Sequence, residues 1–287
     1  MISILLIIIY LIIAPILGGF IFGIDRKVTA RIQNRQGPPI IQPFYDVIKL
    51  WNKEKAVSNP VEKIFILGYL ILTIFSGVIF FSGGDLLLIV FVLALAHTLL
   101  IVSAYSANAP YSSIGAEREL ISIMVIEPIL ILLTIGFYIV TDSFLVSDII
   151  TKQTPAIYSL PAIFLLLIIS LTLKLQKSPY DISTSHHAHQ ELVKGLTTSF
   201  SGRTLAEIEI AHWYETILLL GFVFLFFSGS PILGISAVCI CYLLEIFIDN
   251  LYPRFTWQMT VKSLWIATII FGIGNIVYLN IISGGVM

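Results

Sequence analysis

Residues 204–227 read TLAEIEIAHWYETILLLGFVFLFF, an apolar run that carries several ionisable side chains near its start. A helix needs roughly 20 apolar residues to cross a bilayer, and this run is long enough. Glu209, His212 and Glu215 recur every three residues, so they share one arc of such a helix. Because histidine titrates near neutrality and environments can move carboxylates toward it, the arc predicts a proton relay. A static buried hydrogen-bond network is the alternative.

The rest of the chain has the same apolar character. It is 57% hydrophobic and 11% charged over 287 residues, with a mean hydropathy of +0.98. Helices satisfy their own backbone hydrogen bonds, which makes them the natural form of a membrane span. The sequence therefore predicts an all-α, polytopic membrane protein with about eight spans, at residues 2–23, 64–81, 86–105, 120–140, 158–175, 208–227, 232–247 and 264–282.

We expect one membrane domain that covers residues 1–287. Its parts are a first helix (1–24), a cytoplasmic loop with an amphipathic helix (25–63), helices two to five (64–175), a second cytoplasmic loop (176–206) and helices six to eight (207–287).

The distribution of basic residues predicts the orientation of the chain. Of the 16 Lys and Arg residues, all but Lys152 fall in or beside the odd-numbered connections between spans. The positive-inside rule then places these connections in the cytoplasm and both termini outside. The net charge is −1 and no basic tail is present, so the composition does not favour a nucleic-acid partner.

The first cytoplasmic connection contains IIQPFYDVIKLW at residues 40–51. Phe44, Ile48 and Trp51 recur at helical spacing, and Pro43 stands near a plausible helix start. This pattern predicts a short amphipathic helix that lies in the membrane interface. Such a helix serves either as a lipid anchor or as an element that shapes a cavity against neighbouring subunits.

Glu127 precedes Pro128 inside the fourth predicted span. A carboxylate at that depth is costly in free energy, so a functional role is the default interpretation. The alternative is a protonated glutamate whose hydrogen-bond partner is a backbone group freed where Pro128 kinks the helix. Glu117 and Glu119 stand at the expected mouth of the same helix, where they form either a funnel or an exposed charge cluster. Glu119 and Glu127 are eight residues apart and lie near one helical face, so a proton would pass between them through water.

The second cytoplasmic connection concentrates ionisable groups. Residues 173–195 read LKLQKSPYDISTSHHAHQELVKG, and four of the five histidines lie between Lys174 and Glu215. Histidines at this spacing can share a metal ion, but no further residues complete a tight ligand set. We therefore predict no metal site and interpret the segment as a relay or partner contact, with the residues Asp181, His186, His189 and Glu191. A solvated loop is the alternative.

Several other polar positions receive simpler interpretations. His97 is expected to be a hydrogen-bonded core histidine, and Lys174 and Lys177 to extend along the apolar surface to the interface. Glu207 is expected to face the surface or a partner. Glu245 and Asp249 are expected either to face a cavity or to pair with Arg254.

The two cysteines, Cys239 and Cys241, are two residues apart on one helix and point to different faces. Iron–sulfur clusters usually need four thiolates. We therefore expect no redox cofactor and no catalytic residue in this chain.

Six motifs resemble the NADH dehydrogenase subunit 1 family, the heel subunit of respiratory complex I, in the order of that family. They are DRKVTARIQNRQGP (25–38), QPFYDVIKL (42–50), GAERELIS (115–122) with the following Glu127-Pro128, SPYDIS (178–183), ELVKG (191–195) and YPRFTWQMTVKSLW (252–265).

Two departures from the family pattern favour one branch. STSHHAHQELVKG stands where quinone-reducing members usually have an acidic run, and Trp257-Gln258-Met259 replaces the usual Asp-Gln-Leu. These features are similar to the membrane subunit of energy-converting [NiFe] hydrogenases, of the Ech and formate-hydrogenlyase type.

That resemblance implies a membrane anchor and ion-translocation subunit of an oxidoreductase complex in a prokaryotic cell membrane. Ferredoxin- or formate-driven proton reduction would be coupled to H⁺ or Na⁺ transport. The implied partners are the large and small hydrogenase subunits on the cytoplasmic face, which carry the NiFe centre and [4Fe–4S] clusters, together with antiporter-like membrane subunits and lipid.

The implied mechanism is electrostatic. Turnover in the docked arm changes charge at the Asp181–Glu191 segment, with Arg31 and Arg35 as further contacts, and then shifts the protonation of Glu127 and the 209–215 arc. The alternatives are a quinone-reducing complex I subunit, a membrane-bound sulfur reductase subunit and a stand-alone secondary transporter. A quinone-sized cavity that opens to lipid near the first helix and the amphipathic helix would favour the quinone-reducing subunit, and a loop-filled cavity would count against it.

Overall fold

The computed structural model describes residues 2–54, 59–152, 154–180 and 195–284. Most of these residues are helical. The elements are α1 (Ile2–Ile32), α2 (Gln42–Asn52), α3 (Pro60–Phe81), α4 (Leu86–Ser106), α5 (Pro110–Thr141), α6 (Val146–Thr151), η1 (Ala156–Tyr158), α7 (Pro161–Lys174), η2 (Gly195–Thr197), α8 (Arg203–Leu225), α9 (Pro231–Leu251), α10 (Trp257–Ala267), the π-helical turn η3 (Thr268–Ile273) and α11 (Gly274–Gly284).

Within the described residues, seven helical segments are long and apolar enough to cross a membrane. They are α1, α3, α4, α5, α8, α9 and the continuous helix from α10 to α11. The remaining predicted span, residues 158–175, forms α7, a shorter helix of 14 residues. The chain is therefore an all-α, multi-pass membrane protein, and this prediction is confirmed.

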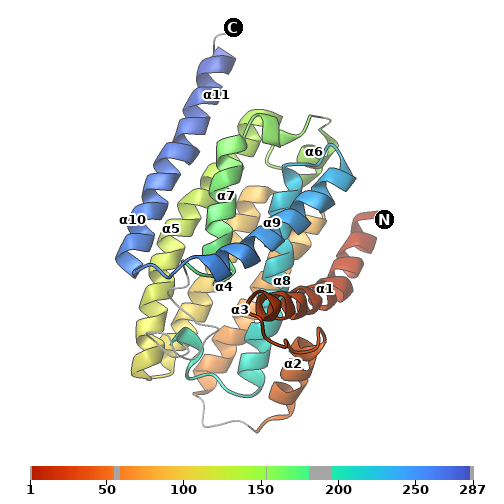
Figure 1. The fold of residues 1–287 in the computed structure, drawn as a ribbon. Coiled ribbons are helices and arrows are strands. Elements are labelled where there is room, and N and C mark those ends of the chain that lie inside the picture. The colour runs from red at the N-terminus through yellow and green to blue at the C-terminus, as the bar shows by residue number, and fades with distance from the viewer. Residues whose placement is uncertain (1, 55–58, 153, 181–194, 285–287) are drawn as a thin grey trace.

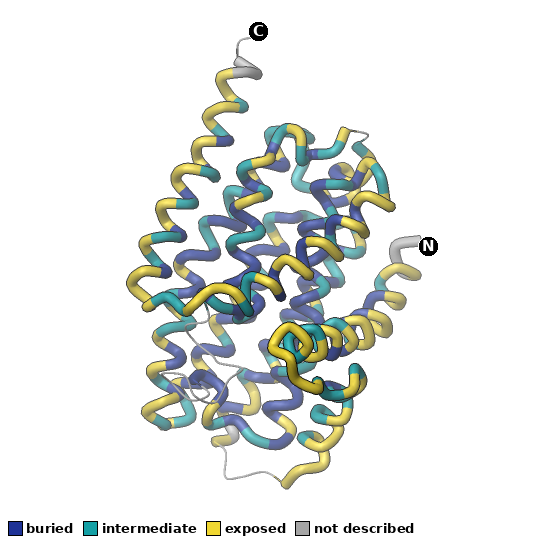
Figure 2. Tube along the Cα trace, in the orientation of Figure 1, coloured by how far each residue is buried: buried dark blue, intermediate teal, exposed yellow. Residues whose placement is uncertain are grey.

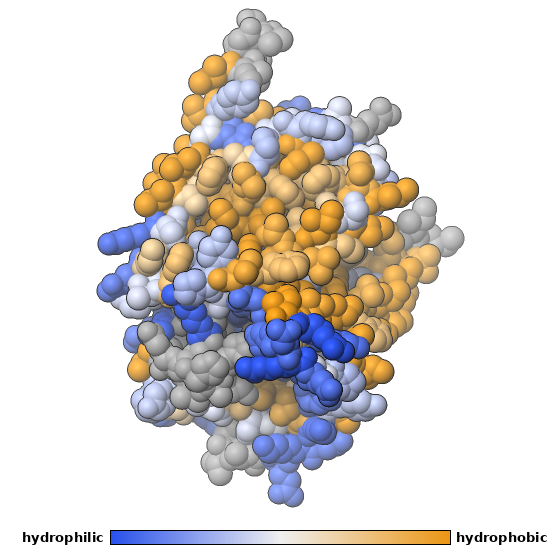
Figure 3. All heavy atoms as spheres, viewed as in Figure 1, coloured by the Kyte–Doolittle hydropathy of each residue, from blue (hydrophilic) through white to orange (hydrophobic). Residues whose placement is uncertain are grey.

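Helices α3, α4, α5, α7 and α8 stand side by side, while α1 and α9 cross this group obliquely and α10–α11 lies on its flank (Figure 1). Burial is greatest in α4, α5, α7 and α8, whereas α1, α9 and α10–α11 are largely exposed (Figure 2). An apolar band crosses the visible face, and hydrophilic residues gather toward the end of the bundle where α2 lies (Figure 3). We call this end the α2 end.

Two helices extend further than hydropathy predicts. Helix α1 continues through the charged residues after position 23 to Ile32, so Arg31 lies in its last turn. Helix α5 begins at Pro110, so Glu117 and Glu119 lie within the helix rather than at its mouth. A hydropathy window reports where apolar side chains stop, but backbone hydrogen bonding continues into water.

The predicted amphipathic helix is present as α2. Ile48 and Trp51 are exposed, as expected for side chains in a membrane interface. Phe44 differs from this expectation, because its ring makes edge-on contacts with Phe20 of α1 and Trp213 of α8, at centroid distances of 5.3 and 5.2 Å. This inward contact holds α2 against α1 and α8.

Gly115 of α5 packs directly against the backbone of η2. A Cβ atom at position 115 would clash with the Leu196 backbone nitrogen. We expect Gly115→Ala to lower the free energy of unfolding by about 1–3 kcal/mol, as overpacking typically does. Gly274→Ala is the matched control, since nothing lies within 4 Å of its added Cβ. Thermal unfolding of the purified protein checks the prediction, and equal midpoints for the two variants would contradict it.

Candidate functional site

The carboxylate of Glu215 lies at the centre of the helical group. Glu215 is 3% exposed. Its Oε1 atom lies 3.1 Å from His97 Nε2 of α4 and 3.1 Å from Lys174 Nζ at the end of α7. The Lys174 and His97 nitrogens are themselves 3.0 Å apart. One carboxylate oxygen therefore contacts two basic groups that also contact each other.

The second carboxylate oxygen faces α3 and the preceding turn of α8. Tyr69 OH donates to Glu215 Oε2 at 3.4 Å, and His212 Nδ1 lies 3.9 Å from the same oxygen. Tyr69, His97, Lys174, His212 and Glu215 are called the central cluster below. Four helices thus supply its members, and a buried carboxylate is stabilised by several polar partners at once.

The hydrogen bonds of His97 define where its ring exchanges a proton. Its Nδ1 atom lies 2.8 Å from the Leu93 carbonyl oxygen, which can only accept, so Nδ1 carries a hydrogen. Nε2 is then the atom that gains or loses a proton, and it faces both Lys174 and Glu215. When Nε2 carries no hydrogen, the Lys174 ammonium donates a hydrogen bond to it. When Nε2 carries a hydrogen, His97 donates to Glu215 Oε1. A proton can therefore move within the cluster without a change of fold.

Glu127 lies beside the central cluster. It lines a small cavity together with His97 and Lys174, and its side chain is half-buried. Glu119 of α5 and Glu209 of α8 also act electrostatically on the Tyr69 hydroxyl. Of the six residues predicted for an ion path, the structure thus brings Glu127, His212 and Glu215 together, and it places the half-buried Glu119 and Glu209 within electrostatic range of Tyr69.

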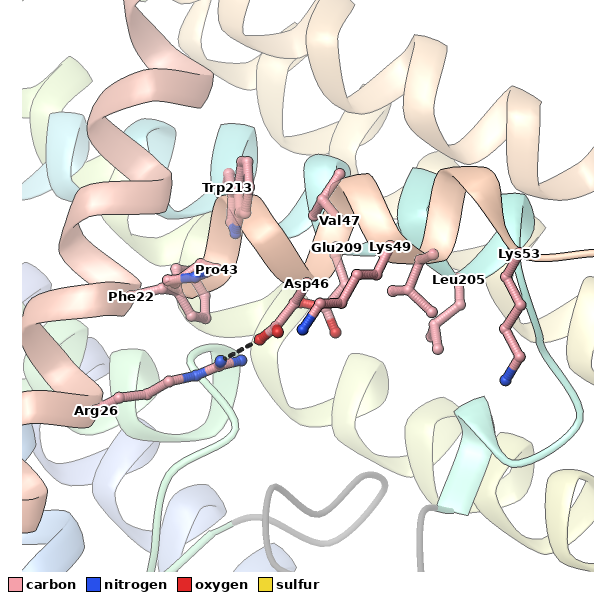
Figure 4. A pocket seen from close by; sticks show the side chains of 11 residues that line it. Phe22, Arg26, Pro43, Asp46, Val47, Lys49, Lys53, Leu205, Glu209 and Trp213 are labelled. Atoms are coloured by element: carbon pink, nitrogen blue, oxygen red, sulfur yellow. Dashed lines mark hydrogen bonds and ion pairs between the residues drawn. The ribbon is translucent and has the colours of Figure 1, made fainter. Parts of the chain in front are cut away.

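Glu209 also lines a pocket of about 380 Å³ between α1, α2 and α8. Figure 4 shows Arg26 of α1 and Asp46 of α2 facing each other there, and their side chains form an ion pair of 2.7 Å. Phe22 and Trp213 add aromatic surface to the lining. The volume lies within the range of small-molecule sites, about 300–1,000 Å³. The lining of the pocket contains both charged and apolar side chains.

Three other predicted site residues, Glu117, Arg31 and Arg35, lie apart from the cluster. Glu117 and Arg31 are exposed. Arg35 lines a second pocket, of about 390 Å³, between α1, the segment after α7, and α9. The four predicted contact residues of the second cytoplasmic connection lie outside the described residues; they are Asp181, His186, His189 and Glu191.

Three simpler interpretations from the sequence are wrong or incomplete. Lys174 and Lys177 do not extend to the interface, because both are mostly buried in ion pairs with Glu215 and Asp25. Glu207 is buried rather than on the surface. His97 is a core histidine, as expected, but it also contacts the central carboxylate. Nothing in the local sequence distinguishes a lysine that extends from the end of an apolar run to the interface from one that is buried there in an ion pair.

The described residues contain no group of three or more His, Cys, Asp or Glu side chains that could hold a metal ion. Cys239 is exposed and Cys241 is buried, so the two thiols lie on different faces of α9, as the spacing predicted. The chemistry that this site supports is proton or charge transfer among carboxylate, imidazole and ammonium groups.

Comparisons with known proteins show the family to which the chain is related. The NADH dehydrogenase family profile matches residues 3–280. Hydrogenase-4 component C of Escherichia coli (strain K12) is 25% identical, covering 76% of this chain and 73% of that protein. NADH-ubiquinone oxidoreductase chain 1 of Mycosarcoma maydis is 28% identical, covering 77% of this chain and 73% of that protein.

A solved structure also matches. A chain of the membrane-bound sulfane sulfur reductase, an archaeal respiratory membrane complex, superposes with a TM-score of 0.86 at 27% identity. The match covers 96% of the present chain and 99% of that chain. These relatives are subunits of oxidoreductase complexes. The chain belongs to the NADH dehydrogenase family, as a membrane subunit of the kind found in complex I-like and hydrogenase-type complexes.

Proposed function

We propose that this chain is the membrane anchor and ion-coupling subunit of an energy-converting, hydrogenase-type complex in a prokaryotic cell membrane. Partner subunits at the α2 end would carry the NiFe centre and iron–sulfur clusters, and antiporter-like subunits would adjoin it in the membrane. Proton reduction driven by ferredoxin or formate would be coupled to the movement of H⁺ or Na⁺.

The observation that carries this proposal is the central cluster. Ionisable groups inside membrane segments are costly in free energy and mark ion paths by default. Here Glu215, His97 and Lys174 meet within about 3 Å of one another, and Glu127 lines the adjoining cavity. A membrane anchor alone has no need of such a group, since apolar contacts between helices would hold it together as well.

The position of Lys174 supplies a route for coupling. It is the last residue of α7, and the chain after it runs through Lys177 toward the second cytoplasmic connection. A partner that displaces this connection during turnover would pull Lys174 away from Glu215. The carboxylate would then lose its nearest cation and take up a proton. The proposed coupling is therefore an exchange between an ion pair and a proton on Glu215.

Affinity purification of the tagged chain from its own membranes tests the assignment. We expect a large partner subunit with four nickel-binding cysteines, and hydrogen evolution from reduced ferredoxin or formate in the preparation. A complex without nickel and without hydrogen evolution would contradict the hydrogenase assignment.

Two observations favour a different terminal electron acceptor for the complex. The similarity to the sulfane sulfur reductase chain supports a sulfur-reducing complex, which sulfide production by the same preparation would reveal. The 380 Å³ pocket between α1, α2 and α8 lies beside the first helix and the amphipathic helix, where a quinone-reducing subunit would need its cavity. Reduction of a soluble quinone, inhibited by a competitive quinone analogue, would establish that alternative.

A further inference from the structure

A second group of buried charges lies between α1, α9 and the segment after α7. Lys177 Nζ is 2.8 Å from Asp25 Oδ2, and the Tyr242 hydroxyl donates to the same oxygen at 3.0 Å. The Lys177 ammonium also lies 4.8 Å from the Tyr242 ring centroid. The charge of Asp25 is therefore matched by Lys177.

The carboxylate of Glu245 has no comparable ion-pair partner among the described residues. It is 0% exposed, and neither of its carboxylate oxygens has a hydrogen-bond partner among the described residues. Its electrostatic neighbours are Lys177, Asp249 and Asp25. Asp249 Oδ1 accepts a hydrogen bond from the Ser178 backbone nitrogen at 2.8 Å. Lys177 thus lies among the carboxylates of Asp25, Glu245 and Asp249.

The spacing on α9 directs Glu245 toward the second pocket. Tyr242 and Asp249 stand three residues before and four residues after Glu245, so the three side chains share one helix face. Tyr242 and Asp249 both line the 390 Å³ pocket, together with Asp25 and Lys177. Glu245 lies behind this lining, between two residues that contact the pocket.

A buried carboxylate without hydrogen bonds is unfavourable as an anion, so it favours a bound cation. A metal ion needs several oxygen ligands, and no group of three candidate ligands is placed to hold one within the described part of the chain. A proton needs a single oxygen. We propose that Glu245 is a proton-loading site, filled from the pocket through Asp249 and the Asp25–Lys177 pair.

The step is a reversible protonation. An O–H bond forms on the Glu245 carboxylate, the charge of the site rises by one, and release to the pocket restores it. The titratable groups that face Glu245 are Asp25 from α1, Lys177 from the segment after α7, and Cys241, Tyr242 and Asp249 from α9.

The two buried sites meet at the end of α7. Lys174 and Lys177 are three residues apart, and each is the cation of one cluster. Movement of this short segment would change both sites together. The proton-loading role of Glu245 does not depend on the identity of the redox partners, nor on the central cluster being an ion path.

Infrared difference spectroscopy of the whole complex in lipid nanodiscs, with pH steps in H₂O and D₂O, tests the proposal. We expect a deuterium-sensitive carbonyl band of a carboxylic acid that is lost in Glu245→Gln and displaced in Glu245→Asp. Cys239→Ser, an exposed position on the same helix, is the control and should retain the band. Glu215→Gln should also retain it, which separates this test from that of the central cluster.

Three results would overturn the proposal: no such band in the wild-type complex, an unchanged band in Glu245→Gln, or a sodium-dependent spectral change that Glu245→Gln removes without any change in proton uptake. The last result would assign the site to a metal cation. If Glu245→Gln fails to assemble, the displaced band of Glu245→Asp decides the assignment alone.

Discussion

Glu215→Gln is expected to reduce coupled ion transport by about 100-fold or more, because the amide can neither release a proton nor pair with Lys174. Positioned proton-transfer groups typically contribute 10²- to 10⁴-fold, and about 100-fold is the lower end of that range. The measurement is ion uptake by inverted vesicles, driven by the electron donor of the complex and normalised to the amount of assembled complex.

Two further variants make this test specific. Glu127→Gln should also lower transport, since Glu127 lines the cavity beside His97 and Lys174. Glu117→Gln is the matched control, because this glutamate lies on the same helix as Glu127 but is exposed. If Glu215→Gln and Glu127→Gln both assemble and both transport ions at the wild-type rate, the central cluster is not an ion path.

The sequence predicted the helices well because each apolar run must form a helix to satisfy its backbone in lipid. It also identified Glu215 and His212, since ionisable residues within an apolar run are conspicuous. The lengths of α1 and α5 were underestimated, because their charged turns leave the bilayer without ending the helix.

The partners of Glu215 were not predictable by the same reasoning. His97 and Lys174 are 118 and 41 residues away in the chain, and only the packing of α4 and α7 against α8 brings them to one oxygen. Lys174 shows the limit most clearly. Its position at the end of α7 is equally compatible with a solvated lysine and with a buried ion pair.

Asp25 illustrates the same limit of prediction from the sequence. Its place in the charged turn after an apolar run carries no sign of a buried partner. In the fold it accepts from Tyr242 and pairs with Lys177, which come from α9 and from the segment after α7. Chemistry shared between helices distant in sequence becomes visible only when the helices are placed side by side.

Lys174→Met is expected to destabilise the protein by about 3 kcal/mol, the lower end of the cost of leaving one partner of a buried ion pair uncompensated. The loss should stay at that end because His97 Nε2 remains 3.1 Å from Glu215 Oε1 as a polar partner of the carboxylate. Thermal unfolding of the purified protein and its yield from membranes measure the effect.

The double variant Lys174→Met/Glu215→Gln distinguishes an ion pair from simple packing. Removing both charges leaves no buried ion uncompensated, so stability should recover toward the wild-type value while ion transport stays abolished. The coupling free energy from this double-mutant cycle should be favourable to the pair, at about 0.5–3 kcal/mol for residues in contact. If the two destabilisations simply add, Lys174 and Glu215 do not act as a pair. Recovered stability without transport would show that the pair is retained for its ion chemistry and not for the fold.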